Sequence, residues 1–352
     1  MANFNLTRED KFPAGASVSV YDATGYDRWP GSAPGTAVQT LTMVAGGVTF
    51  TGLTAGGRYF ASDGTNHLAF TANAGDAERD ETAGGVWYCN ANSGLDANSG
   101  DSWDQAFLTI DKALDSASDG DEIHITGKFR EQLTPANTLG GIRIVGHSNR
   151  PRHSDSPWPT GAAWLPPASP ASATALLTIR AQGWRVENIL FDAPADAAAI
   201  ELERNALSGD SEFDGSHFSA VGCRFDAGQS GIENDGGAGF CWIEDCMFRG
   251  LTNGIKTLNT AVAVPLQWVI RNNEFHDNTN HIDGPFSRSS IRGNTFGKFT
   301  TLCYDGTGGE YNSIWGNSIS GDYDAGNVPG SNEEWGGNFN SLTGGVTAAD
   351  PT

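Results

Sequence analysis

A repeat that begins near residue 186 limits the folds open to this chain. Six short strands each end on an aromatic or aliphatic residue, and these residues are Phe191, Phe225, Phe248, Phe275, Phe296 and Ile319. A small or aliphatic residue lies five positions before each, at Val186, Ala220, Ile243, Ile270, Ile291 and Ile314. A fixed register at intervals of roughly 20 to 30 residues is typical of a solenoid. The helical period is absent and the chain holds 46 glycines, so we expect β coils stacked about 4.8 Å apart in a right-handed parallel β-helix.

The position two residues before each of these strand-ending residues forms a second column. Its members are Ile189, Cys223, Cys246, Asn273, Asn294 and Asn317. Asparagine is a poor strand residue, but an inward amide at a bend can bond to the coils on either side. We therefore interpret Asn273, Asn294 and Asn317 as a structural column in which Cys223 and Cys246 are small core residues. Asn272 lies one place outside the column and should face the other way.

The rest of the chain divides into four parts by its patterning. Residues 1–75 alternate and carry glycine turns, which predicts a small β-sandwich, and the polar residues 76–85 read as a linker. The β-helix is expected over 86–330, with one capping helix at about 104–117 that begins at Asp104. Residues 331–352 are expected to form a C-terminal cap and tail. The predicted fold class is all-β.

Composition excludes several functions. The formal net charge of −21 disfavours nucleic-acid binding through a basic face. No apolar run approaches the roughly 20 residues that span a bilayer, so no membrane insertion is expected, and no signal peptide is visible at the N-terminus. The five cysteines show no zinc spacing, and a disulfide framework is not indicated, so they read as buried apolar residues. The histidines show no metal spacing either, and we predict neither a metal nor a cofactor.

Carboxylates are the candidate catalytic groups. The position after the inward isoleucine of each coil should face outward, and it holds Glu201, Glu233, Lys256, Asp283 and Tyr304. Glu201 and Glu233 would lie one coil apart, near 5 Å, and Asp283 two coils from Glu233, near 10 Å. These spacings suit a glycosidase pair, but a solvated acidic face would show the same pattern. His281 should also face outward.

Two other features bear on binding. The proline-rich insert 147–173 contains Trp158 and Trp164, which would suit glycan or subunit contacts if exposed and would otherwise pack against the coils. Two acidic loops could hold calcium but lack the full EF-hand pattern, so turn chemistry is favoured there. Their residues are Asp96, Asn98 and Asp101 in the first loop, and Asp322 and Asp324 in the second.

The stretch "WYCNANSGLDANSGDSWDQAFLTIDKALDSASDGDEIHIT" resembles the start of pectin-lyase-like right-handed β-helices. The matching residues are Ser93, Gly94, Asp96, Asn98, Gly100, Trp103, Phe107, Ile110, Ala113, Leu114, Gly120, Asp121 and Ile123. The resemblance covers roughly 86–330 and implies a fold more than a chemistry, because this fold hosts many functions.

Two further stretches, "MANFNLTREDKFPAGASVSVY" and "VTFTGLTAGGRYFA", are similar to short N-terminal domains of bacteriophage virion proteins. The ending "GDYDAGNVPGSNEEWGGNF" resembles tails that close phage β-helices. This resemblance implies a homotrimeric appendage, assembled in the host cytoplasm and displayed on the virion surface. Residues 1–75 would attach it to capsid or tail proteins.

Three functions remain open from the sequence. The first is a non-enzymatic virion appendage, either a tail fibre or a capsid decoration, that binds host surface polysaccharide or stabilises the particle. The second is a polysaccharide-degrading tail spike, a glycoside hydrolase or lyase that uses Glu201, Glu233 or Asp283. The third is an adhesin-like binder, which the missing signal peptide disfavours.

Overall fold

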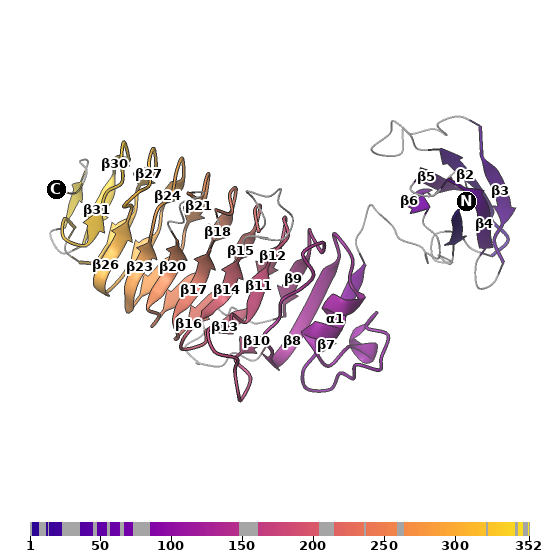
Figure 1. The fold of residues 1–352 in the computed structure, drawn as a ribbon, viewed down its shortest axis with the longest axis horizontal. Helices are drawn as coiled ribbons and strands as arrows, with labels where there is room; N and C mark the ends of the chain where they lie inside the picture. Colours follow the sequence, from indigo (N-terminus) through magenta and orange to yellow (C-terminus); the bar gives the residue numbers. More distant parts are fainter. Residues whose placement is uncertain are drawn as a thin grey trace. The chain divides into compact units, whose positions relative to one another are not determined.

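The chain forms two compact units, Met1–Gly85 and Val86–Thr352, in the computed structural model drawn in Figure 1. Each unit is described by itself. The structure describes residues 2–6, 12, 14–22, 36–44, 48–54, 57–63, 67–72, 85–147, 161–203, 215–235, 237–258, 264–321, 323–341, 344–347 and 351.

The N-terminal unit consists of two small antiparallel sheets. One pairs β1 with β4, and the other has the strand order β3-β2-β5-β6. The strands are β1 (Ala2–Leu6), β2 (Ser17–Asp22), β3 (Gln39–Thr42), β4 (Val48–Leu53), β5 (Gly57–Ser62) and β6 (His67–Ala72). Both sheets contribute to one core, with Val18 and Val20 from β2 meeting Phe50 and Leu53 from β4. The unit therefore has its own hydrophobic core. The proposed linker 76–85 lies outside the described residues except for Gly85.

A short helix stands at the start of the second unit, among the first strands. The elements here are β7 (Val86–Asn90), the 3-10 turn η1 (Trp103–Gln105), α1 (Ile110–Ser116), β8 (Glu122–Arg130), β9 (Arg143–Gly146) and β10 (Ala162–Leu165). The helix buries Ile110, Ala113 and Leu114 against the coils.

The helix begins at Ile110, so the predicted start at Asp104 is wrong. Thr109 is its N-cap and accepts a hydrogen bond from the Lys112 amide. The Glu131 carboxylate accepts from the amides of Ile110 and Asp111 at 3.0 and 2.9 Å. Thr109 is a local signal for this start, while the contact with Glu131, which follows β8, comes from 20 residues along the chain and depends on the fold.

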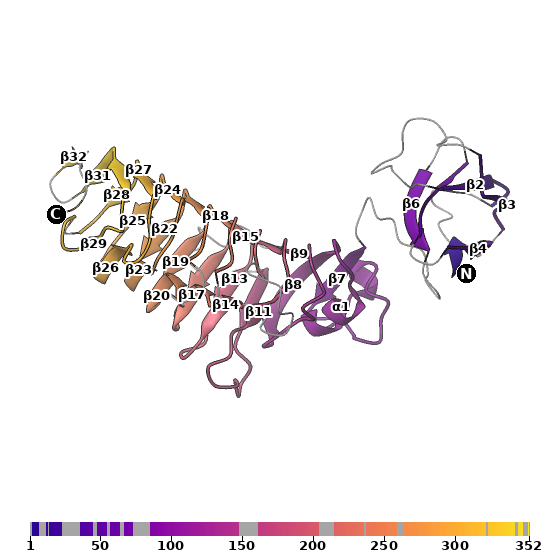
Figure 2. The same cartoon turned by 45° about the horizontal axis from the view of Figure 1, so that its top comes forward.

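From β9 onward the chain winds as a right-handed parallel β-helix, seen from two directions in Figures 1 and 2. Each coil contributes strands to three faces. Face 1 contains β12 (Arg185–Glu187), β15 (Ser219–Val221), β18 (Trp242–Glu244), β21 (Val269–Arg271), β24 (Ser290–Arg292), β27 (Ser313–Trp315) and β30 (Glu334–Gly336). Face 2 contains β13 (Leu190–Asp192), β16 (Arg224–Asp226), β19 (Met247–Arg249), β22 (Glu274–His276), β25 (Thr295–Phe296), β28 (Ser318–Ile319) and β31 (Asn338–Asn340).

Face 3 is a separate seven-stranded sheet. Its strands are β11 (Leu177–Ile179), β14 (Ala198–Leu202), β17 (Ser230–Asn234), β20 (Asn253–Thr257), β23 (Asn278–Asp283), β26 (Phe299–Asp305) and β29 (Asn327–Val328). Parallel pairing continues through β30 and β31, so the coils extend beyond residue 330 to Asn340. The strand β32 (Gly345–Thr347) then pairs antiparallel with β31 and ends the stack.

The register of the coils confirms the sequence repeat. Phe191 pairs with Phe225, Phe225 with Phe248, and Phe248 with Phe275. Their rings stack inside the coils with centroids 4.8–5.1 Å apart and planes within 8° of parallel. One aromatic side chain per coil therefore fills the core at the coil spacing, and offset stacking adds to the area it buries.

The asparagine column forms a continuous ladder of hydrogen bonds. The Asn273 amide donates to the Asn294 Oδ1 at 2.9 Å, and the Asn294 amide to the Asn317 Oδ1 at the same distance. Asn338 extends the ladder by one coil at 3.0 Å. Each side chain also donates to the carbonyl of the coil before it, as Asn294 does to Ile270. The buried amides are thus paired.

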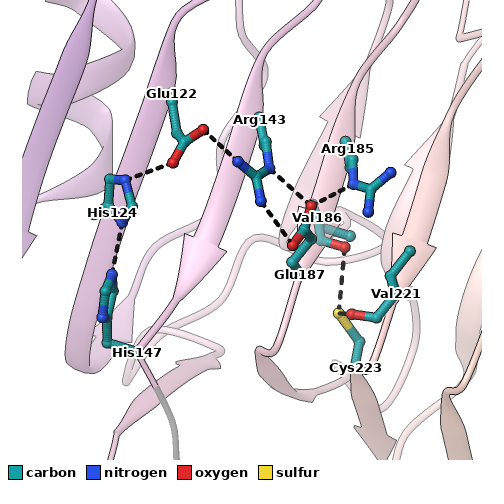
Figure 3. Close-up of polar contacts among 9 residues, drawn as sticks. All are labelled: Glu122, His124, Arg143, His147, Arg185, Val186, Glu187, Val221 and Cys223. Atoms are coloured by element: carbon teal, nitrogen blue, oxygen red, sulfur yellow. Dashed lines mark hydrogen bonds and ion pairs between the residues drawn. The ribbon is translucent and has the colours of Figure 1, made fainter.

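The cysteines of this column are small core residues. The Cys246 amide donates to the Asn273 Oδ1, and the Cys223 thiol lies against the carbonyls of Val186 and Val221 (Figure 3). All five cysteines are free and buried. Asn272 is excluded from the column because it occupies the bend, with a φ of 56°.

None of the helices within the described ranges has the length and apolar character required to cross a membrane.

Candidate functional site

The strands of face 3 share a four-residue unit whose first and last side chains point outward. In β17 the Ser230 hydroxyl donates to the Glu233 carboxylate at 3.0 Å, so both side chains point to the same, outer side of the strand, although Ser230 itself is buried. The second residue must point inward, because a Cβ at Gly231 would lie 2.7 Å from the Phe248 ring. Gly254 has the same environment against Phe275. The unit thus directs two residues out and two in.

The fourth position of this unit forms a row of charged side chains along face 3. Strand pairing places Glu201 beside Glu233, Glu233 beside Lys256, and Lys256 beside Asp283. Asp305 follows Asp283. We call these five residues the carboxylate row. The structure therefore brings the three predicted catalytic candidates onto one face, at steps of about 4.8 Å per coil.

Two predicted outward side chains in this region point inward instead. Tyr304 is 2 % exposed and pairs with the inward Ile282, while its hydroxyl donates to Glu333 at 2.6 Å. His281 is 0 % exposed and lies among aromatic rings. The register shifts between β23 and β26, where β26 has seven residues, so counting from Phe296 misassigned Tyr304. His281 occupies the second position of the four-residue unit, which points inward and which glycine fills in β17 and β20.

Asp305 was missed for the same reason. The four-residue unit begins at Ser230, Asn253 and Asn280, and Leu302 begins it in the next coil. Counting from that first residue places Asp305 in the row. The shifted register of β26 therefore accounts for Asp305 and Tyr304, and the second inward residue of each unit accounts for His281.

Partial burial and mutual repulsion raise the pKa values of two acids in the row. Burial raises the pKa of Glu201, and the charges of Glu203, Asp235 and Glu233 raise it further. Burial also raises the pKa of Asp283, with Asp305 as the next cause. Both groups keep a proton more readily than an ordinary carboxyl group. A carboxyl group that holds its proton in this way can donate it as a general acid.

Glu233 has a different environment. The Lys256 ammonium lies 3.3 Å from its Oε1, and the Glu233 side chain is 18 % exposed and that of Lys256 25 %. The ion pair compensates the negative charge of this carboxylate. The row thus combines a carboxyl that tends to hold its proton with one whose charge is compensated, which is the combination that acid–base cleavage requires.

A solvated acidic face is the competing explanation. It would leave these carboxylates exposed, whereas burial is the largest cause of the raised pKa of Glu201 and Asp283. Exposed surface charges also tend to be neutralised by neighbours of opposite sign. Here one lysine accompanies four carboxylates, and Asp235 beside them has a raised pKa as well. Placing these like charges together lowers the stability of the fold. Such clusters of acids with shifted pKa values are common at functional sites.

A second charged cluster, on the first coils, is different in character (Figure 3). Arg143 donates to Glu122 at 2.5 Å and to Glu187 at 2.8 and 3.0 Å, and Arg185 also pairs with Glu187. These ion pairs link β8, β9 and β12, and hydrogen bonds from Arg143 hold the pKa of Glu187 below its ordinary value. Because each carboxylate is neutralised by a guanidinium, this cluster ties the coils together and lacks an available acid.

The remaining candidates do not form a site. Trp164 is 0 % exposed and donates its indole N–H to the Glu131 carbonyl, so it cannot contact a glycan. Trp158 lies outside the described residues. In the first acidic loop, Asp96 accepts hydrogen bonds from the amides of Leu108 and Thr109, so its carboxylate ties the loop to the segment before α1. Within the described ranges, no group of three or more metal-ligating side chains could hold an ion.

No protein-family model matches the chain, and no curated protein matches it either. It is similar to three solved structures in particular. A rhamnogalacturonan lyase is 14% identical with a TM-score of 0.38, over 74% of this chain and 88% of that one. Pectin methylesterase PemA from Erwinia chrysanthemi is 14% identical with a TM-score of 0.37, over 75% and 85%. The Yersinia enterocolitica family 28 exopolygalacturonase is 9% identical with a TM-score of 0.33, over 94% and 75%.

These three neighbours are pectin-lyase-like parallel β-helix proteins, and each is named as an enzyme that acts on a polysaccharide. At such low identities and scores, the similarity concerns the fold alone. A function for this chain has to be argued from its own side chains.

Proposed function

We propose that the unit Val86–Thr352 is a glycoside hydrolase that cleaves a polysaccharide along face 3. The observation that carries the proposal is the carboxylate row, in which half-buried acids with raised pKa values lie beside Glu233 and its lysine partner. A stack of parallel strands presents these groups along one line, which suits an extended polymer.

In this mechanism Asp283 is the general acid and Glu233 the general base. They lie two coils apart, about 10 Å between backbones. This separation leaves room for a water molecule between the base and the sugar, and it is too wide for a carboxylate that attacks the sugar directly. Glu233 takes a proton from water as the oxygen attacks the anomeric carbon. The glycosidic bond breaks, and Asp283 gives its proton to the leaving oxygen. The anomeric configuration should therefore invert.

The charge of the row selects against acidic polymers. Four carboxylates and one lysine would repel a polyuronate, and the whole chain carries a net charge of −21. A lyase that removes a proton beside a uronate carboxylate would need compensating cations, and the one cation of the row, Lys256, is already paired with Glu233. We therefore expect a neutral polysaccharide as substrate.

The test is a reducing-end assay of the full chain on dextran, galactan and mannan, with polygalacturonate as the acidic comparison. Cleavage of a neutral polymer should fall at least 100-fold in Asp283→Asn and in Glu233→Gln. Glu334→Gln, an exposed carboxylate on face 1, is the matched control and should retain full activity. Equal activity in all four proteins, or none on any polymer between pH 4 and 8, would refute the proposal.

A second candidate function concerns the N-terminal unit. Its own core makes it an independent module, which supports a role as an attachment domain. The whole chain would then be a phage virion appendage, on the capsid or the tail, assembled in the host cytoplasm as a homotrimer and exposed at the virion surface. This candidate is compatible with cleavage, since a surface appendage can bind host polysaccharide with or without degrading it.

A further inference from the structure

A shallow hollow lies on face 1, and none of its lining residues belongs to the carboxylate row. It has a volume of about 300 Å³ and spans three successive coils. Its lining consists of Phe240, Trp242, Gln267, Trp268, Val269, Arg288 and Ser290. The volume is at the lower end of the roughly 300–1,000 Å³ typical of small-molecule sites. It therefore suits one small ring rather than a peptide or a second domain.

Aromatic side chains form one end of the hollow. Trp242 is 43 % exposed although it lies in a regular strand between Ser219 and Val269. Phe240 precedes it at a left-handed bend with a φ of 57°, and its ring stacks on His217 with centroids 5.1 Å apart. Since Val269 in the next coil is smaller, the Trp242 ring stands above its neighbour and leaves part of its surface open.

Polar groups form the other end, and their side chains are not engaged elsewhere. Gln267, Arg288 and Ser290 have no side-chain hydrogen bond or ion pair within the part of the chain that the structure describes. By contrast, Arg271 on the same face is paired with Glu244 at 2.8 Å. An amide, a guanidinium and a hydroxyl can together donate to and accept from several hydroxyl groups.

We propose that this hollow binds a single pyranose residue of a polysaccharide. The apolar face of the sugar ring would lie against Trp242, and its hydroxyl groups would bond to Gln267, Arg288 and Ser290. An exposed aromatic ring beside free donors matches the amphipathic surface of a sugar. This site would bind the sugar without cleaving it, and it lies on a different face from the carboxylate row. It does not require the carboxylate row to cleave anything, so either assignment can fail without the other.

The test uses the full chain with ¹⁵N-labelled tryptophan and follows the indole N–H signals by NMR. The probes are methyl glucoside, methyl galactoside, methyl rhamnoside and N-acetylglucosamine, each titrated to 100 mM. Trp242→Phe assigns the Trp242 signal. Trp315 is the internal control because it has the same exposure of 43 % on the same face but lies outside the hollow.

At least one sugar should shift the Trp242 signal with saturation and leave Trp315 unchanged. Arg288→Ala should weaken that binding at least threefold, while Arg292→Ala, at the end of strand β24 and outside the lining, should not. Three results would overturn the inference: no shift with any probe, equal shifts at both tryptophans, or a Trp242 signal that changes with protein concentration alone. The last would identify the hollow as a contact between copies of the chain.

Discussion

Single buried residues stabilise the interior of this protein through hydrogen bonds to the neighbouring coils. An asparagine at the inner bend is useful because its side chain both accepts from and donates to the neighbouring coils, where an aliphatic side chain would do neither. Asn294 accepts from the amide and the side chain of Asn273, and it donates to Ile270 and Asn317. The low strand propensity of asparagine is thus outweighed by the pairing of buried polar groups.

Asn294→Ala should lower the free energy of unfolding by about 2–4 kcal/mol, because it leaves several buried groups of the ladder without partners. Chemical denaturation at pH 7.5 measures the loss. Asn92→Ala is the control, since this side chain is exposed, and it should change stability by less than about 0.5 kcal/mol. Equal stabilities for the two variants would mean that the ladder does not hold the coils.

His281 gives the fold a dependence on pH. Burial lowers its pKa to about 4, from an ordinary 6.5, while its Nε2 lies 3.1 Å from the Gly297 carbonyl and its Nδ1 3.0 Å from the Asn278 amide nitrogen. The unfolded chain therefore binds a proton below pH 6.5 that the folded chain refuses until about pH 4. Stability is present above pH 6.5 and is lost as the pH falls through this window, by ~3 kcal/mol.

His281→Gln should flatten this dependence, because glutamine can bond to the same partners without titrating. Denaturation curves from pH 7.5 to 4 measure it against the parent chain, with the exposed His276→Gln as control. The raised pKa values of Glu201 and Asp283 act in the opposite direction, since folded carboxyls that bind protons early gain stability as the pH falls. Comparing the variants at each pH removes that common contribution.

At the scale of the strand, the four-residue unit of face 3 positions the carboxylate row. Two adjacent inward residues allow the outer two to lie close together, as Ser230 and Glu233 do. The second position of the unit, which points inward, has no room for a side chain in β17 and β20. A Cβ at Gly254 would lie 2.5 Å from the His281 carbonyl and 2.9 Å from the Phe275 ring. Glycine is required there by close packing.

Gly254→Ala should therefore destabilise the protein by about 1–3 kcal/mol through overpacking. It should also reduce cleavage, because β20 carries Lys256 and pairs with the strand that carries Asp283. Thr252→Ala, an exposed change two residues earlier, is the control and should affect neither property. Denaturation and the reducing-end assay measure the two effects. Undiminished stability in Gly254→Ala would mean that the inward position tolerates a side chain.

At the scale of the whole molecule, the two units have separate cores and can be tested separately. Deletion of residues 1–75 should leave the melting temperature of the β-helix unit within a few degrees of its value in the full chain. If the chain is a virion appendage, the same deletion should abolish its incorporation into particles. Sedimentation equilibrium of the full chain should then give three times its mass of 37.1 kDa.

Cryo-EM of particles carrying the full chain would locate it on the capsid or the tail. A truncated chain that still joins particles would contradict the attachment role of the N-terminal unit. A particle-free full chain that cleaves a neutral polysaccharide would leave the hydrolase proposal standing, so the two functions are decided by different measurements.

The sequence by itself determined the stack of coils, the aromatic column and the asparagine ladder. Each of these is a side chain that recurs at a constant register, and parallel strands pair recurring positions directly. Glu201, Glu233 and Asp283 were found on one face for the same reason.

Tertiary structure decided which side chains of adjacent coils contact one another. It added Glu131 to the start of the helix, turned His281 and Tyr304 inward, and placed Asp305 in the row. It also determined that Trp164 is buried and that Trp242 borders an open hollow. These outcomes depend on the residues one coil away, 20 to 30 positions along the chain, and on the space they leave, so a local pattern cannot contain them.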